Sequence, residues 1–120
     1  RAAIYALRNR KDIQPAMGEE YRKRMFYAAD RINAIPKMHV IYPPKGSFYL
    51  FINIKKTGLT SESAAELMLR EAHVLTLPGN AFGKCGEGFV RIACTVGVNE
   101  LKEAFDRIER IPVFSGQAEA

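Results

Sequence analysis

Several features common in other protein classes are missing from this 120-residue chain. It has only two cysteines, Cys85 and Cys94, too few for a disulfide framework or for a zinc site of about four clustered ligands. Its longest apolar runs, such as residues 48–52, are far shorter than the roughly 20 residues that span a bilayer. Its first ten residues carry charges and no small-residue cleavage site, so no secretory signal is recognisable. We therefore expect a reduced, cytoplasmic setting, with no metal site and no membrane partner.

Several catalytic and nucleotide-binding motifs are absent as well. There is no G-x-S-x-G motif, and neither His39 nor His73 lies in a nucleophile pattern. The glycines around residues 79–84 resemble a phosphate loop, but the spacing is one residue short and Cys85 replaces Ser or Thr. A strand also follows where phosphate binding needs a helix N-terminus. The same glycines do not fit G-x-G-x-x-G, so they do not indicate nucleotide binding.

The composition that remains is globular, with an uneven distribution of charge. Residues 1–45 contain ten Lys or Arg against four acids, a net charge of +6, whereas residues 46–120 have a net charge of −1. A basic first third is typical of a surface for nucleic acid or an acidic partner, and also of a solvated helix face. The charges alternate with apolar positions, which favours the solvated face.

Helical periodicity dominates the first third of the chain. Residues 2–10 are typical of the end of a helix with no cap before it, which we interpret as a sign of a fragment. Pro15 suits the first turn of a second helix over residues 15–35. Its apolar positions follow steps of three and four: Met17, Tyr21, Met25, Ala28, Ile32 and Ile35. A helix of this length reaches about 30 Å and is typical of a connection between domains.

The rest of the chain predicts strands and shorter helices. Residues 47–54 form the strongest strand, and both of its faces are largely apolar, so we expect both to be covered. Shorter strands are predicted over residues 39–42, 74–77 and 89–94. Helices are predicted after the possible N-caps Thr60, Ser61 and Ser63, and after Asn99.

This order of elements predicts an α+β fold, or α/β sandwich. A small, mainly antiparallel sheet with helices packed on it follows a long helix of the interdomain type. We expect a helical segment over residues 1–36, a domain over residues 37–114 and a frayed tail over residues 115–120.

Arg91 is the residue whose placement most requires an explanation. It lies between Val90 and Ile92 in an apolar strand, and a guanidinium buried without a partner is unfavourable. Removing one partner of a buried ion pair costs about 3–5 kcal/mol, so the strand predicts an anion facing Arg91. A protein carboxylate in a structural ion pair would satisfy it. A ligand carboxylate or phosphate, held bidentately, would do so equally well.

The segment that contains Arg91 resembles a known family motif. Residues 78–92, PGNAFGKCGEGFVRI, are similar to the closing motif PGxxFGxxGxGxxRI of class I/II pyridoxal-phosphate aminotransferases, the aspartate aminotransferase family. Residues 44–49, PKGSFY, resemble the family's P-x-G-[AS]-F-Y strand entry. The helix over residues 15–35 is similar to the family's interdomain helix, and residues 101–111 to its last helix. This resemblance covers nearly the whole chain and implies the C-terminal small domain of such an enzyme.

The resemblance also implies roles for residues and partners. It implies that Arg91 binds the α-carboxylate of the substrate and that Phe48 lines the substrate side of the site. The Schiff-base lysine of an SxSK-like segment, and the residues that hold pyridoxal phosphate, would lie upstream. The fragment alone should then be inactive and free of cofactor. The full-length enzyme would transfer an amino group between an amino acid and a 2-keto acid, as a homodimer that includes its own large domain, although the same fold also hosts lyases and synthases.

A ferredoxin-like RNA-binding module is the alternative from a different class. Residues 85–92 can be aligned with its strand [KR]-G-[FY]-[GA]-F-V-x-[FY], with matches at Gly86, Gly88, Phe89 and Val90. Glu87, however, takes the place of a base-stacking aromatic and would repel phosphates. The order of elements also differs from that module, so we expect no nucleic-acid partner. A non-catalytic regulatory domain that binds a small molecule is a third possibility.

Overall fold

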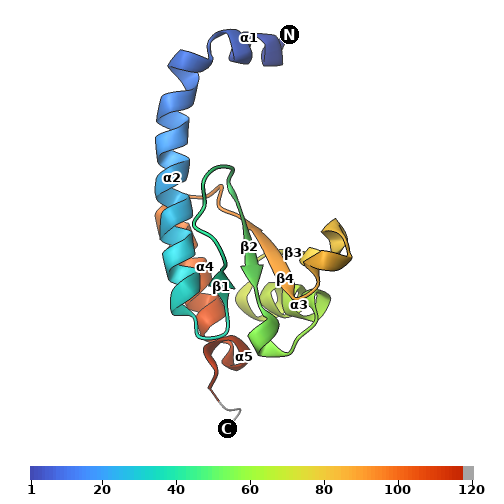
Figure 1. The fold of residues 1–120 in the computed structure, drawn as a ribbon. Coiled ribbons are helices and arrows are strands. Elements are labelled where there is room, and N and C mark those ends of the chain that lie inside the picture. Colours follow the sequence, from blue (N-terminus) through green and yellow to red (C-terminus); the bar gives the residue numbers. More distant parts are fainter. Residues whose placement is uncertain (118–120) are drawn as a thin grey trace.

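The computed structural model describes residues 1–117 and consists of a helical arm attached to a sheet that helices cover (Figure 1). Its helices and strands, in chain order, are α1 (Ala2–Arg8), α2 (Arg10–Ala34), β1 (His39–Val40), β2 (Tyr49–Asn53), α3 (Ser61–Ala72), β3 (Leu77–Pro78), β4 (Phe89–Ala93), α4 (Val98–Glu109) and α5 (Pro112–Ser115). Three 3₁₀ turns complete the chain: η1 (Lys55–Thr57), η2 (Gly79–Phe82) and η3 (Lys84–Gly86). The α+β class is confirmed.

The sheet has four strands in the order β1-β2-β4-β3, and every pairing is antiparallel. Phe51 of β2 lies opposite Arg91 of β4, and Leu77 of β3 lies opposite Arg91 on the other side. Directly opposed residues point to the same face of a sheet, so these three side chains form one row across three strands.

One face of the sheet forms the hydrophobic core with helices α2, α3 and α4. The inward side chains of β2 and β4 and of the residues that follow them are buried: Leu50, Ile52, Ile54, Val90, Ile92 and Cys94. The helices contribute residues at helical spacing, among them Met25, Ala28, Ile32, Met68, Leu101, Phe105 and Ile108. Burial raises the pKa of the Cys94 thiol to about 11, so this cysteine is a core residue and is not reactive.

The opposite face of the sheet is open, which corrects the expectation that both faces of the strand over residues 47–54 are covered. Tyr49 and Phe51 alternate with buried Leu50 and Ile52 and keep 40% and 38% of their surface exposed. The apolar run is therefore not the sign of a strand buried on both sides. Its outward half consists of aromatic residues on a surface that the described chain leaves uncovered.

Helix α2 begins five residues earlier than predicted, at Arg10, so Pro15 lies inside the helix and not in its first turn. All of its buried residues lie between Met25 and Ile32, in the C-terminal half that packs on α4 and the sheet. Its N-terminal half, with α1, extends beyond the sheet (Figure 1), and the described chain measures 56 × 31 × 25 Å. We call residues 2–24 the arm; it exposes Ile4, Tyr5, Leu7, Ile13 and Met17.

The ends of several elements differ from the predictions. The last helix begins after Gly97 instead of Asn99, whereas α3 has the expected cap, with the Thr60 hydroxyl accepting a hydrogen bond from the Ser63 N–H. The strand predicted over residues 39–42 is only β1. The strand predicted over residues 74–77 overlaps β3 only at Leu77, because the chain first closes α3, with His73 in the left-handed conformation and the Val74 N–H donating to the Met68 carbonyl oxygen. Of the expected frayed tail, α5 includes Ser115, and residues 118–120 lie outside the described residues.

Candidate functional site

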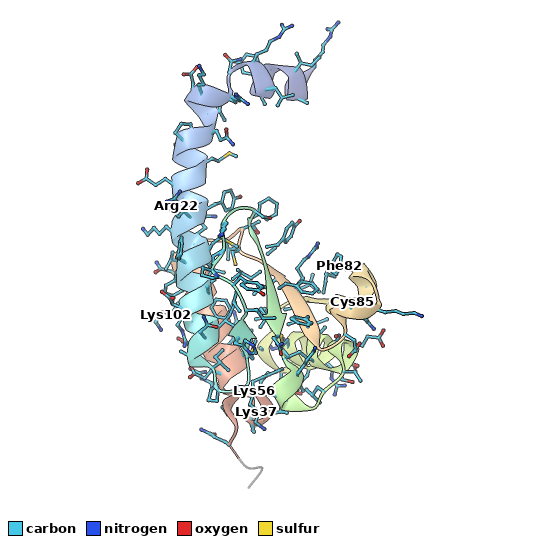
Figure 2. The ribbon with its side chains drawn as sticks, in the orientation of Figure 1. Arg22, Lys37, Lys56, Phe82, Cys85 and Lys102 are labelled. Carbon is cyan, nitrogen blue, oxygen red and sulfur yellow. The ribbon has the colours of Figure 1, made fainter. Side chains whose placement is uncertain are left out.

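The open face of the sheet brings aromatic and cationic side chains together. Tyr49 and Phe51 come from β2, Phe89 and Arg91 from β4, and Phe82 from η2, which follows β3. Figure 2 shows Phe82 on the loop that stands out beside β4. Phe82 keeps 52% of its surface exposed, although it has aromatic neighbours. We call this group of five residues the aromatic face.

Arg91 lies against two rings of the aromatic face. Its Cζ atom is 4.1 Å from the ring centroid of Tyr49 and 4.4 Å from that of Phe82. Both distances are within the range of a cation–π interaction, which is stronger when the cation is partly desolvated, as this half-buried guanidinium is.

No carboxylate of residues 1–117 forms an ion pair with Arg91. The arginines of the described residues that form ion pairs with carboxylates are Arg24, Arg31, Arg70 and Arg107, all on helices. No side-chain hydrogen bond from Arg91 occurs within the described part of the chain either. Of the two anions that the sequence left open, the carboxylate of a structural ion pair is therefore not supplied by these residues.

Other rings extend the aromatic face on either side of Arg91. Phe51 stacks on Phe89 with centroids 5.3 Å apart, and it meets the edge of Phe82 at 6.0 Å. The Lys55 ammonium lies 5.1 Å from the Phe89 centroid, so a second cation is held in the same way. Such a surface is suited to an anionic ligand with an apolar portion, because cations and rings are both within reach.

Phe48, the second residue that the resemblance implies, lies beside the aromatic face. Its ring is half-buried, with its centroid 5.5 Å from that of Tyr21 on α2 and 4.5 Å from that of Tyr49. Ser47, which precedes it, has φ = 66°, the left-handed conformation that non-glycine residues adopt rarely. Tyr49 thus contacts both Phe48 and Arg91, and it is the residue that connects the two predicted site residues.

A groove of about 1290 Å³ opens next to Phe48. It runs between the arm and the loop of residues 44–48. Its lining combines apolar side chains such as Met17 and Phe26 with the basic residues Arg10, Lys11, Arg22 and Lys45. The groove continues the open surface from the sheet onto α2.

The glycine-rich loop before β4, the strand of Arg91, is tightly packed. A Cβ atom on Gly79 would clash with the Gly86 carbonyl oxygen and would lie 2.7 Å from the Phe89 carbonyl oxygen. Gly88 has φ = 81°, which glycine adopts without strain. The loop therefore turns where residues with side chains would not fit, and β4 starts directly after it.

Two polar residues, Ser61 and Glu87, hold this loop, a role that the sequence did not predict for them. The Ser61 hydroxyl contacts backbone atoms of the loop, and the Glu87 carboxylate accepts a hydrogen bond from the Ser61 N–H at 2.8 Å. The RNA-binding alignment also fails here, because residues 84–86 form the turn η3 and Glu87 is a helix-capping group instead of part of a stacking strand. The sequence did contain one signal for this role: Ser61 follows another potential cap, Thr60, and a helix start needs only one of the two hydroxyls as its cap.

The described residues contain no cluster of metal ligands, and their lysines lie at or near the surface. In residues 1–117, no three His, Cys, Asp or Glu side chains gather in a way that could hold a metal ion. Seven of the eight lysines are exposed and Lys37 is half-buried, whereas a lysine that forms a Schiff base is activated by desolvation or by a neighbouring cation. Lys102 is instead paired with Asp106, which raises its pKa. Within the same residues, no helix is both long and apolar enough to cross a membrane.

Known proteins match both the sequence and the fold of this chain. The sequence profile of the family "Aminotransferase class I and II" matches residues 1–108. An aspartate aminotransferase of Pyrococcus abyssi is 45% identical over 112 residues, which are 92% of this chain and 28% of that protein. The structure of an aromatic aminotransferase from Pyrococcus horikoshii superposes with a TM-score of 0.73 at 42% identity, covering 83% of this chain and 26% of the other.

A third match bears on the cofactor. A putative aminotransferase from Clostridium difficile with bound pyridoxal phosphate superposes with a TM-score of 0.69 at 29% identity, covering 76% of this chain and 24% of the other. The chain thus spans about a quarter of the length of its relatives, and pyridoxal phosphate is the cofactor of the family. A family match over most of the chain and the shared fold lead to one conclusion: this chain belongs to the class I and II aminotransferases.

Proposed function

We propose that the full-length protein is a pyridoxal-phosphate-dependent aminotransferase, which transfers an amino group between an amino acid and a 2-keto acid. The observation that carries this proposal is Arg91, which faces the open side of the sheet and has no carboxylate partner among residues 1–117. Family membership supplies the reaction class, and the arginine supplies a place for the substrate.

Arg91 is proposed to bind the α-carboxylate of the substrate. The rings of Tyr49 and Phe82 interact with the π system and charge of the guanidinium and do not use its N–H donors. A planar carboxylate can therefore accept two parallel hydrogen bonds from Arg91. Fixing the substrate in this way orients its reacting bonds, which is the main contribution that a remote binding group makes to the rate.

The other parts of the chain take supporting roles in this proposal. Phe48 lines the substrate side through its contact with Tyr49, at the end of the groove beside the arm. Residues 1–36 form the helical segment that leads from the large domain, and residues 37–114 form the small domain. The large domain would cover the open face and the apolar residues of the arm, and the full-length protein would be a homodimer.

Pyridoxal phosphate does not fit the residues of this chain. Its lysines lie at the surface, and its glycine loop precedes a strand where a phosphate needs a helix N-terminus. When bound, the cofactor supplies the electron sink for amino transfer. Its ligands are proposed to lie in the part of the relatives' length that this chain does not match.

The test is to replace Arg91 by lysine in the full-length enzyme. Arg91→Lys keeps the charge and loses the bidentate geometry, so kcat/KM for an amino-acid substrate should fall by about 10- to 100-fold. The corresponding decarboxylated amine has nothing for the guanidinium to bind, so its slow reaction should change little. The absorbance of the bound cofactor should also stay unchanged.

Arg70→Lys is the matched control, because Arg70 is an exposed arginine of α3 that pairs with Glu66 away from the aromatic face. It should leave both substrates unaffected. Equal losses on the amino acid and on the amine in Arg91→Lys would mean that Arg91 has a structural role only, and the proposed carboxylate site would then be rejected.

A further inference from the structure

Ser61 is buried although the helix it belongs to does not need its side chain. It is the first residue of α3 and has an exposed fraction of 0%. The N-cap of this helix is the preceding residue, Thr60, whose hydroxyl accepts the Ser63 N–H. The Ser61 hydroxyl is therefore free to serve another element, and it points to the glycine loop.

The hydroxyl forms three contacts with the backbone that leads into β4. It accepts hydrogen bonds from the N–H groups of Gly88 at 2.9 Å and Phe89 at 3.3 Å, and it lies 3.4 Å from the Gly86 carbonyl oxygen, to which it can donate. One donor and two acceptor positions are the full capacity of a hydroxyl. The three groups that it holds lie 25 to 28 residues later in the chain.

Glu87 completes the connection from the opposite direction. Its carboxylate accepts the Ser61 backbone N–H, one of the N–H groups at the helix start that have no partner within the helix. A further contact joins the same two regions, since the Asn80 side chain donates to Glu62 at 3.1 Å. The first turn of α3 and the loop before β4 are thus connected by reciprocal hydrogen bonds and should move as one unit.

We propose that Ser61, with Glu87, is a positioning residue for Arg91. The hydroxyl fixes the N–H groups of Gly88 and Phe89, and Arg91 follows Phe89 by two residues in the same strand, opposite Phe51. The contact thereby sets where β4 begins and how the guanidinium is presented to a substrate carboxylate. This inference rests on the proposed function of Arg91 and adds the residues that hold it in place.

The experiment compares Ser61→Ala with Thr60→Ala in the full-length enzyme. Both remove a hydroxyl from the start of α3, but only the first removes the contact with the loop. For an amino-acid substrate, Ser61→Ala should raise KM or lower kcat/KM on the order of tenfold, because a small displacement of a binding group has a large effect on the rate. The decarboxylated amine should be affected far less, and Thr60→Ala should affect both substrates little.

Glu87 provides a second pair of variants in case Ser61→Ala does not fold. Glu87 is exposed, so its replacement leaves the core intact. Glu87→Ala removes the acceptor for the Ser61 N–H and should produce the same selective loss on the amino acid. Glu87→Gln keeps an acceptor oxygen at the same distance and should restore most of it.

The outcomes separate this inference from the proposed function. If Arg91→Lys discriminates between the two substrates and both Ser61→Ala and Glu87→Ala do not, the positioning role is wrong while the carboxylate site stands. If Arg91→Lys itself shows no discrimination, the proposed function fails first. A selective loss in both variants, with rescue by Glu87→Gln, supports the positioning role, because a general loss of stability would lower both activities together.

Discussion

At the scale of single residues, the open face holds its cations against rings in place of carboxylates. Arg91 contacts Tyr49 and Phe82, and Lys55 contacts Phe89. A ring attracts the positive charge of a guanidinium through its π electrons, whereas a protein carboxylate would accept hydrogen bonds from its N–H groups. The aromatic contacts thus leave Arg91 available for the proposed binding of an anion.

Gly79 gives a prediction at this scale. Gly79→Ala should lower the free energy of unfolding by about 1–3 kcal/mol, because its methyl group would meet two backbone carbonyl oxygens that cannot move independently. Gly46→Ala is the control, since a Cβ atom there has no neighbour within 4 Å and should change stability by less than about 0.5 kcal/mol. Denaturant unfolding of the two variants measures the difference. Similar stabilities would contradict the close packing of the loop.

The sequence predicted some site residues and not others for a physical reason. Arg91 could be singled out because a permanent charge inside an apolar strand is unusual on its own. Phe82 and Ser61 could not be assigned their roles, since these depend on partners distant in the chain: Phe82 on Arg91 and Phe51, and Ser61 on the loop. In addition, the usual interpretation of a serine at the start of a helix is an N-cap.

At the scale of elements, an ion network joins α2 to α4. Arg31 donates from Nη2 to the carboxylates of Asp106 at 2.8 Å and Glu109 at 2.9 Å, and Lys102 donates to Asp106. The hydrogen bond from Lys102, and next that from Arg31, hold the pKa of Asp106 below its ordinary value of 3.8. The C-terminal half of α2 is therefore held on α4 by ion pairs as well as by the packing of its buried residues.

Asp106→Asn should make the melting temperature of the chain change less as the pH is lowered. A carboxylate with a lowered pKa in the folded state stabilises the fold above its ordinary pKa, and this contribution disappears as the pH falls through the lowered value. The variant should thus have a lower Tm than the native chain at pH 7, and the difference should vanish toward about pH 2. Asp30→Asn, an exposed acid of α2, is the control. A Tm difference that stays constant with pH would contradict the ion network.

The sequence predicted which segments are helices and strands, because their periodicities are clear. It did not predict which faces of these elements are covered by other parts of the chain. The strand over residues 47–54 has the composition of a buried strand, yet β2 leaves Tyr49 and Phe51 exposed. An apolar composition indicates that a strand face is suited to burial. It does not indicate whether the residues that cover this face belong to the same segment of chain. The start of α2 was misplaced for a related reason, since Pro15 is tolerated inside the arm, where no core packing depends on a regular helix.

At the scale of the whole molecule, the chain is a core with one uncovered face and an apolar arm. The core includes buried side chains from the C-terminal half of α2 and from β2, α3, β4, α4 and α5. Many of the exposed large apolar residues lie on the arm and on the aromatic face, and others, such as Tyr42, Leu69 and Leu75, lie elsewhere on the surface. Large exposed apolar areas of this kind are typical of interaction surfaces.

Residues 1–120 should fold alone and be catalytically silent. Stability of roughly 6–18 kcal/mol follows from about 0.05–0.15 kcal/mol per residue. Because every lysine is at or near the surface, pyridoxal phosphate followed by borohydride should label no single lysine stoichiometrically, and no transamination should occur. Circular dichroism tests whether the chain folds alone, and mass spectrometry of the reduced adducts tests whether one lysine is labelled. One defined lysine adduct with measurable turnover would contradict the absence of a cofactor site from this chain.

The placement of Pro15 gives α2 an uneven mechanical stiffness. Proline has no N–H, so the Lys11 carbonyl, four residues earlier, lacks its usual backbone donor. This compliant point lies in the arm, about 15 Å along the axis from the first buried residue, Met25, at 1.5 Å per residue. Bending at Pro15 would therefore move the tip of the arm while the lower half of the helix, fixed by its core contacts, stays still. The helix would act as a rigid rod with a joint near its N-terminal end, and a movement of α1 and the first turn of α2 could be absorbed at this joint before it reached the strand that carries Arg91.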